Sequence, residues 1–216
     1  MIRDLLSCGV IGPLLFVIVF TIEGTLRPGY RPRRHFVSSL ARGSRGWVQV
    51  ANFLVCGALM LAFTIGLFSG VAPELRGEAA PILFVLLGLG LIVAGVFRTD
   101  VAASDTDASY VAGASHPATL RGLIHGLSSL VVFGSLIAAA FVWAWRSWQA
   151  GALLWAAYSA VTGLVVLKFF VVCSSLVRKE VNGEISNAPI GLSQRLAIIP
   201  GWIWIALVAA RLIRWG

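Results

Sequence analysis

Long apolar stretches alternate with polar segments along the whole chain. A bilayer core about 30 Å thick needs roughly 20 apolar residues for each helical crossing. Unpaired backbone groups are costly in hydrocarbon, and the short alternating strands of a membrane barrel are missing here. The pattern predicts an all-α fold, a polytopic membrane helix bundle with six transmembrane helices, at Leu5–Ile22, Trp47–Phe68, Ala80–Phe97, Leu123–Trp143, Ala152–Val172 and Leu196–Ile213.

Composition agrees with a single transmembrane domain over residues 1–216. The chain is 58% hydrophobic and 12% charged, far from the balance of a soluble domain. Arg3 precedes the first apolar stretch as in a signal peptide, but no small-residue cleavage pattern follows, which predicts a retained helix. Cys8, Cys56 and Cys173 show no paired spacing and are interpreted as packing residues.

The connections between the predicted helices are unequal in length. Those after the first, third and fifth helices are about 24, 25 and 23 residues long, against about 11 and 8 after the second and fourth. Successive helices alternate in direction, so the three longer loops lie on one face of the membrane. We call this side the long-loop face, and we expect a binding site there.

Positive charge is concentrated on the same face. The positive-inside rule then places the long loops in the cytoplasm of a bacterial cell and both termini outside, with the chain in the plasma membrane. A net charge of +8 needs no nucleic acid as a partner, because juxtamembrane arginines attract anionic lipid. The long-loop positions are Arg27, Arg31, Arg33, Arg34, Arg42, Arg45, Arg98, Arg121, Arg178, Lys179 and Arg195, against Arg3, Arg76, Arg146, Arg211 and Arg214 opposite.

The first long connection predicts an ordered bend. Pro28, Gly29 and Pro32 are turn-forming residues, and His35 to Ala41 is expected to form a short helix at the interface. A bend that gathers neighbouring arginines suits a phosphate or carboxylate, although a solvated basic loop touching headgroups is the alternative. The arginines concerned are Arg27, Arg31, Arg33 and Arg34.

Several segments resemble a known family. They are RPGY in the first long connection, GWVQVANF at the start of the second helix, FRTD after the third, and HPATLRGLIHGL before the fourth. With these segments the chain resembles, over nearly its full length, an uncharacterised bacterial integral membrane family, the domain of unknown function 998. The resemblance implies a six-helix membrane domain. It brings no established activity, so no catalytic residue is transferred.

Polar residues at the long-loop ends of the helices form the candidate site. Ionisable groups within a span tend to face partners or a water-filled cavity. Lys168 either extends to the interface or pairs with Glu23 at the matching end of the first helix. The predicted ligand-binding residues are Glu23, Arg27, Arg31, Arg34, Gln49, Asn52, Asp100, His125 and Lys168, and Gln194 shares their position.

A metal site is a weaker alternative. His35, His116 and His125, with Asp100, Asp105 or Asp107, have the nitrogen and oxygen ligands that zinc accepts. However, His116 and His125 lack the one-turn spacing that would place two ligands on one helical face. We therefore expect no cofactor, and each histidine is also readily interpreted as a hydrogen-bonded structural residue.

Three classes of function follow. The first is a non-catalytic module that binds an anionic lipid headgroup, a membrane protein partner or a second copy of itself through a basic, polar pocket. The second is transport of a small solute, and the third is metal-dependent hydrolysis of a lipid within the membrane. The sequence leans away from an enzyme.

Overall fold

The computed structural model describes residues 1–71, 78–100 and 119–215. In this part of the chain, six helices are long and apolar enough to cross a membrane. A short 3-10 helix, η1, follows the first of them, at Val37–Ala41. The all-α polytopic bundle expected from the sequence is confirmed, with helices α1 (Ile2–Leu26), α2 (Gly46–Gly70), α4 (Ala79–Val96), α5 (Leu120–Gln149), α6 (Leu153–Val181) and α7 (Ile190–Trp215).

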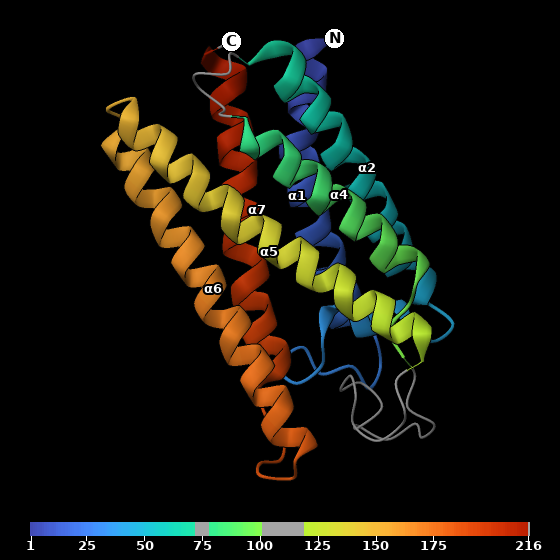
Figure 1. The fold of residues 1–216 in the computed structure, drawn as a ribbon. Helices are drawn as coiled ribbons and strands as arrows, with labels where there is room; N and C mark the ends of the chain where they lie inside the picture. The colour runs from blue at the N-terminus through green and yellow to red at the C-terminus, as the bar shows by residue number, and fades with distance from the viewer. Residues whose placement is uncertain (72–77, 101–118, 216) are drawn as a thin grey trace.

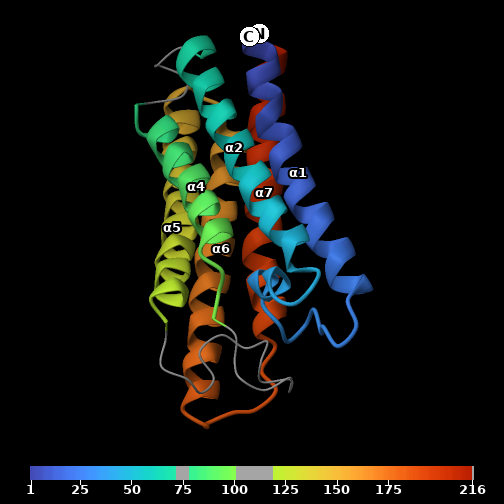
Figure 2. The same ribbon diagram turned by 90° about the vertical axis from the view of Figure 1, so that its right-hand side faces the viewer.

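The six helices form a closed ring. Each helix packs against its neighbours in sequence, and α7 returns to pack against α1. Both chain termini lie at one end of the bundle, whereas residues 27–45 and 182–189 lie at the other (Figure 1). The view from the side shows the same division (Figure 2). The long-loop face is therefore one end of the bundle, as predicted.

Helices α6 and α7 extend further toward that end than their apolar stretches. Helix α6 continues to Val181 and α7 begins at Ile190, so the fifth connection shrinks from the expected 23 residues to residues 182–189. An α-helix satisfies its own backbone hydrogen bonds and can continue beyond the hydrocarbon into water. The apolar pattern marks only the part of each helix that lies in lipid.

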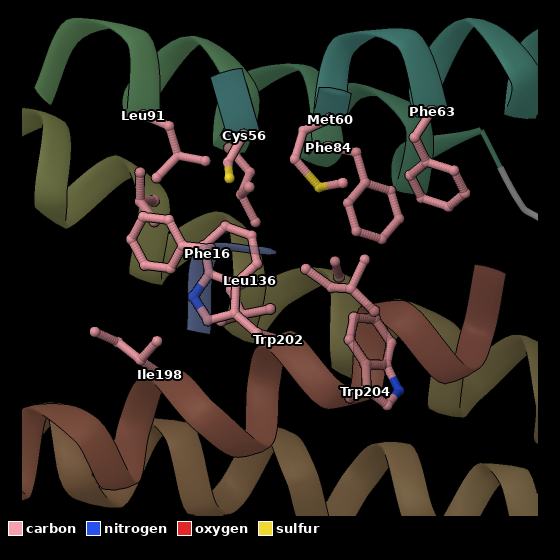
Figure 3. Close-up of a cluster of buried hydrophobic side chains, with 14 of the residues drawn as sticks. Phe16, Cys56, Met60, Phe63, Phe84, Leu91, Leu136, Ile198, Trp202 and Trp204 are labelled. Carbon is pink, nitrogen blue, oxygen red and sulfur yellow. The ribbon is translucent and has the colours of Figure 1, made fainter. Parts of the chain in front are cut away.

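Aromatic side chains fill the middle of the bundle (Figure 3). The ring of Trp202 stacks on Phe16 with centroids 4.7 Å apart, and Trp204 donates its indole N–H to Ser159 Oγ at 3.0 Å. Both tryptophans are almost fully buried. They join α7 to α1 and α6 in the core of the bundle.

Glycines bring two pairs of helices into close contact. A Cβ on Gly57 of α2 would lie 2.8 Å from the carbonyl oxygen of Gly88 on α4, and one on Gly90 would lie 3.2 Å from that of Ser128 on α5. Small residues allow such backbone approach between membrane helices. Gly126 and Gly134 of α5 make no such contact, because a Cβ there would meet nothing within 4 Å.

Candidate ligand-binding cavity

The first long connection is tied to the start of α7. The amides of Gly191 and Leu192 donate to the carbonyls of Arg34 and Arg33, at 3.1 and 2.9 Å. These bonds satisfy backbone groups that a helix start leaves unpaired. Helix η1 forms within the predicted stretch from His35 to Ala41, and it packs against the end of the bundle with Val37 and Leu40 turned toward the protein and Leu40 completely covered.

Arg195 and Tyr30 fasten this connection further. The Arg195 guanidinium donates to the Tyr30 hydroxyl and, at 3.1 Å, to the carbonyl of His35. The Tyr30 hydroxyl in turn donates to the carbonyl of Phe36 at 2.9 Å. Burial raises the pKa of the Tyr30 phenol, so the hydroxyl stays protonated and continues to donate. The bend predicted from the prolines is an ordered structure.

Glu23 is the acidic centre of this end of the bundle. Its carboxylate lies 2.7 Å from Arg27 Nη2 and 2.6 Å from Arg45 Nη2, and the residue is only 3% exposed. Arg27 also donates to the carbonyl of Arg42 at 2.9 Å. The ion pair considered between Glu23 and Lys168 does not form. Lys168 lies on the exposed face of α6, with its amine 5.5 Å from the ring of Phe169.

The arginines of the first connection do not converge on one point. Arg27 faces Glu23, whereas Arg34 pairs with Glu180 at 2.9 Å and donates to Asn187 Oδ1 at 2.9 Å. Arg31 and Arg33 are exposed. The charges of Arg27 and Arg34 are therefore satisfied by carboxylates of the chain, and these arginines hold the loops together.

A cavity of about 360 Å³ lies at the long-loop end of α5, α6 and α7. Helices α5 and α6 are close at their connecting turn and separate toward the long-loop face (Figure 1). Gly126 and Leu130 of α5 and Ser174 of α6 line the cavity and are exposed, so it opens between these two helices. Its inner wall carries most of the polar groups, from Ser38, Thr99, His125, Ser129 and Gln194.

His125 presents a hydrogen-bond acceptor to this cavity. Its Nδ1 lies 3.1 Å from the carbonyl oxygen of Ala94 and 2.9 Å from that of Phe97, both at the end of α4. Carbonyl oxygens only accept hydrogen bonds, so Nδ1 carries the proton. In the neutral ring Nε2 then holds a lone pair. His125 lines the cavity and is 5% exposed, which leaves Nε2 as the ring nitrogen available to a ligand.

Gln194 supplies a complementary donor. Its Oε1 accepts the backbone N–H of Val37 at 2.7 Å, which fixes the amide and leaves the N–H groups of Nε2 for a ligand. A smaller adjoining cavity of about 40 Å³, also lined by Ser38 and Gln194, reaches toward Phe16 and Trp202. Among the described residues that line the two cavities there is no arginine, lysine or carboxylate, so this part of their walls is uncharged.

The other predicted site residues lie elsewhere. Asn52 donates to the carbonyl of Phe16 at 3.2 Å and to Gln49 Oε1 at 3.3 Å, so this pair joins α1 to α2 in the core. Asp100 accepts the amide N–H of Thr119 at 2.9 Å and stabilises the start of α5. Of the nine predicted ligand-binding residues, His125 alone lines the larger cavity.

Metal ligands do not gather in the part of the chain that the structure describes. No group of three or more His, Cys, Asp or Glu side chains is arranged there to hold a metal ion. His35 accepts the amide N–H of Arg31 through Nδ1 at 3.0 Å, and His125 is bound to α4. His116, Asp105 and Asp107 lie outside the described residues.

Sequence reasoning missed most of the cavity wall. Ser38, Thr99, Ser129 and Ser174 line the cavity but are not among the predicted ligand-binding residues. One signal was present, because Gly122, Gly126 and Ser129 place small residues at helical spacing on one side of α5. The partners Glu180 and Asn187 of Arg34 carried no comparable signal, since they lie about 150 residues further along the chain.

The ring of membrane-length helices defines the chain as a multi-pass integral membrane protein. It belongs to the family described as protein of unknown function (DUF998), whose family model matches residues 10–211. No curated protein and no solved structure matches the chain.

Proposed function

We propose that this protein binds an uncharged amphiphilic lipid, one with a hydroxyl or amide head, in the cavity between α5, α6 and α7. The observation that carries the proposal is the pairing of an acceptor, His125 Nε2, with a donor, Gln194 Nε2, on the inner wall of a mostly apolar cavity. A few fixed polar groups in an apolar pocket are typical of small-molecule sites.

The shape and the opening of the cavity favour a lipid as its ligand. It opens between α5 and α6 at a level where exposed Leu127 and Leu130 face the surroundings of the bundle. A ligand can therefore place its head against His125 and Gln194 and leave its chain along the helices. A volume of about 360 Å³ lies in the range of pockets that hold small organic ligands, roughly 300 to 1,000 Å³.

The uncharged wall favours a neutral head over an anionic one. Of the four arginines that suggested an anionic headgroup at this face, Arg27 and Arg34 are paired with Glu23 and Glu180. Burying a lone carboxylate or phosphate against serine, histidine and glutamine without a cation is costly. We place the protein in the plasma membrane of a bacterial cell, where the binding would occur.

A blocking substitution tests this proposal without disturbing the packing. Gly126→Leu inserts a side chain into the cavity, where a Cβ meets nothing within 4 Å. Gly134→Leu is the matched control, because it is equally unhindered, lies two turns further along α5 and does not line the cavity. Binding of 1-monooleoylglycerol to the purified full chain in detergent is measured by native mass spectrometry.

We expect Gly126→Leu to weaken lipid binding about tenfold or more. The leucine side chain would occupy part of the cavity, and such steric conflict reduces the binding free energy by about 1 to 3 kcal/mol. Gly134→Leu should bind as the unmodified protein does. The dimethyl ether of the same lipid, which cannot donate to His125, should bind more weakly. Equal binding by all three proteins, or no preference for the lipid with free hydroxyls, would contradict the proposal.

A further inference from the structure

The smaller cavity beside Gln194 lies within the helix ring. It has a volume of about 40 Å³, and its lining residues come from η1 and from α1, α2, α4, α5 and α7. It shares Ser38, Ser129, Phe133 and Gln194 with the larger cavity, so the two adjoin at these side chains. We call it the inner chamber, and its walls away from the larger cavity include Phe16, Phe53, Leu91, Leu136, Ile198 and Trp202.

Trp202 brings an unpaired hydrogen-bond donor to the inner chamber. The residue is 2% exposed and lines the chamber, and its indole N–H makes no hydrogen bond within the part of the chain that the structure describes. Trp204 differs, because its indole N–H donates to Ser159 Oγ at 3.0 Å. Buried donors in proteins are almost always paired, so an unpaired donor beside a cavity indicates a ligand or a water molecule there.

The indole of Trp202 is held with its nitrogen toward the long-loop end. Its ring stacks on Phe16 with centroids 4.7 Å apart. Figure 3 shows the nitrogen on the side of the ring toward Ile198, away from Trp204. Gln194, Ile198 and Trp202 follow one another at intervals of four residues, which places them on one side of α7. The donors of Gln194 and Trp202 therefore start from positions roughly 12 Å apart along the helix, at about 1.5 Å per residue.

The size and the walls of the inner chamber restrict what can enter it. A water-sized group needs about 10 to 15 Å³ of such space, so the chamber holds roughly three non-hydrogen atoms. Around the Trp202 nitrogen the walls are aromatic and aliphatic, and a charged group would be buried there without a partner. A short uncharged group with one acceptor oxygen fits these conditions. An acetyl group has a carbonyl oxygen, a methyl group and three non-hydrogen atoms in all.

We propose that the inner chamber binds an acetyl group on the head of the lipid whose hydroxyl or amide lies beside His125. This inference rests on the proposed function and names the class of lipid more closely. The carbonyl oxygen accepts the Trp202 N–H, the methyl group contacts the apolar wall, and the long chain leaves between α5 and α6. The ligand is then a neutral, acetylated lipid, and Trp202 is the residue that selects it.

Four glycerol lipids with the same oleoyl chain test the inference. 1-Monooleoylglycerol has no group for the inner chamber, and 1-oleoyl-3-acetylglycerol adds the acetyl group and keeps a free hydroxyl. The 3-isopropyl ether has the shape of the acetyl ester without its carbonyl oxygen, and the 3-hexanoyl ester is too long for the chamber. Binding of each lipid to the purified full chain in detergent is measured by native mass spectrometry.

A pair of substitutions separates the two tryptophans. Trp202→Phe removes the N–H of the inner chamber and keeps an aromatic ring against Phe16. Trp204→Phe is the matched control, because it also removes a buried indole N–H, one that is bonded to Ser159, and Trp204 is not among the residues that line the two cavities. The comparison of the four lipids on the unmodified chain needs neither variant, so it decides the question even if a variant fails to fold.

We expect the unmodified chain to bind the acetyl ester about tenfold more tightly than the isopropyl ether, because only the carbonyl oxygen pairs with the buried N–H. The hexanoyl ester should bind more weakly than the acetyl ester. Trp202→Phe should remove the preference for the acetyl ester over the ether, and Trp204→Phe should retain it.

The failure of this inference can be told from the failure of the proposed function. Equal binding of the acetyl ester and the isopropyl ether, as expected if the chamber holds only water, would overturn the acetyl site alone when 1-monooleoylglycerol still binds. A preference for the acetyl ester that persists in Trp202→Phe would also overturn it. Binding of none of the four lipids would overturn both proposals.

Discussion

Charged side chains at the long-loop end of the bundle are stabilised by ion pairs within the chain. The buried carboxylate of Glu23 pairs with two guanidinium groups, that of the buried Arg27 and that of the half-exposed Arg45. The sequence identified Glu23 and Arg27 as residues that need a partner, because burial of charge near a helix end is costly. It could not identify the partner, since Arg45 is 22 residues from Glu23 and only the folded bend brings them together.

Neutralising Glu23 should therefore weaken the fold. In Glu23→Gln, Arg27 stays buried without its carboxylate, and we expect the free energy of unfolding to fall by about 3 to 5 kcal/mol. Glu184→Gln is the control, because Glu184 is an exposed loop residue and should change stability by less than about 0.5 kcal/mol. Denaturant unfolding in mixed micelles measures both. A loss in Glu23→Gln no greater than in the control would contradict the network's role.

Tyr30 should make part of the stability dependent on pH. Its pKa is raised by burial in the folded chain, so the folded state holds the phenolic proton more tightly than the unfolded state. The stabilisation is complete below the unfolded pKa of about 10 and is lost as pH rises through the folded value.

Comparison with Tyr30→Phe isolates this contribution. The unmodified protein should be more stable than the variant at neutral pH, because the hydroxyl bonds to Phe36 and Arg195 are intact. The difference in unfolding free energy should shrink above about pH 10. A difference that stays constant from neutral pH to about pH 11 would show that the Tyr30 proton does not contribute.

At the scale of helices, close backbone contact holds the ring together. The sequence located every membrane helix because the apolar period and span length are local properties. The sequence does not determine the angles at which neighbouring helices cross. The separation of α5 from α6, and the cavity between them, could therefore not be predicted. The lengths of α6 and α7 were underestimated, since the last turns of α6 and the first turns of α7 carry polar residues.

Gly57 provides a direct test of the contact between α2 and α4. In Gly57→Ala the new methyl group would lie 2.8 Å from the carbonyl oxygen of Gly88 on α4, which forces the helices apart. We expect a loss of about 1 to 3 kcal/mol. Gly134→Ala is the control, because its Cβ meets nothing and alanine favours the helix by up to about 1 kcal/mol. Thermal unfolding in detergent should separate the two, and equal melting temperatures would contradict the packing.

The whole molecule places two different environments at its two ends. At the long-loop end Arg27 and Arg34 are paired with carboxylates of the chain, and the described wall of the nearby cavity carries polar but uncharged side chains. At the end with the termini, Arg146 and Arg211 line a hollow together with Trp143 and apolar residues. The sequence predicted the polar bias of the first end, but it did not predict that Arg27 and Arg34 pair there with Glu23 and Glu180.

The occupancy of the cavity beside His125 is the central claim. An experimental density map of the full chain in nanodiscs of native lipid, at side-chain resolution, tests it directly. We predict elongated density between α5 and α6, with its polar end at hydrogen-bond distance from His125 Nε2 and Gln194 Nε2. A cavity that is filled by the protein's own side chains, or in which α5 and α6 close together over His125, would contradict this account.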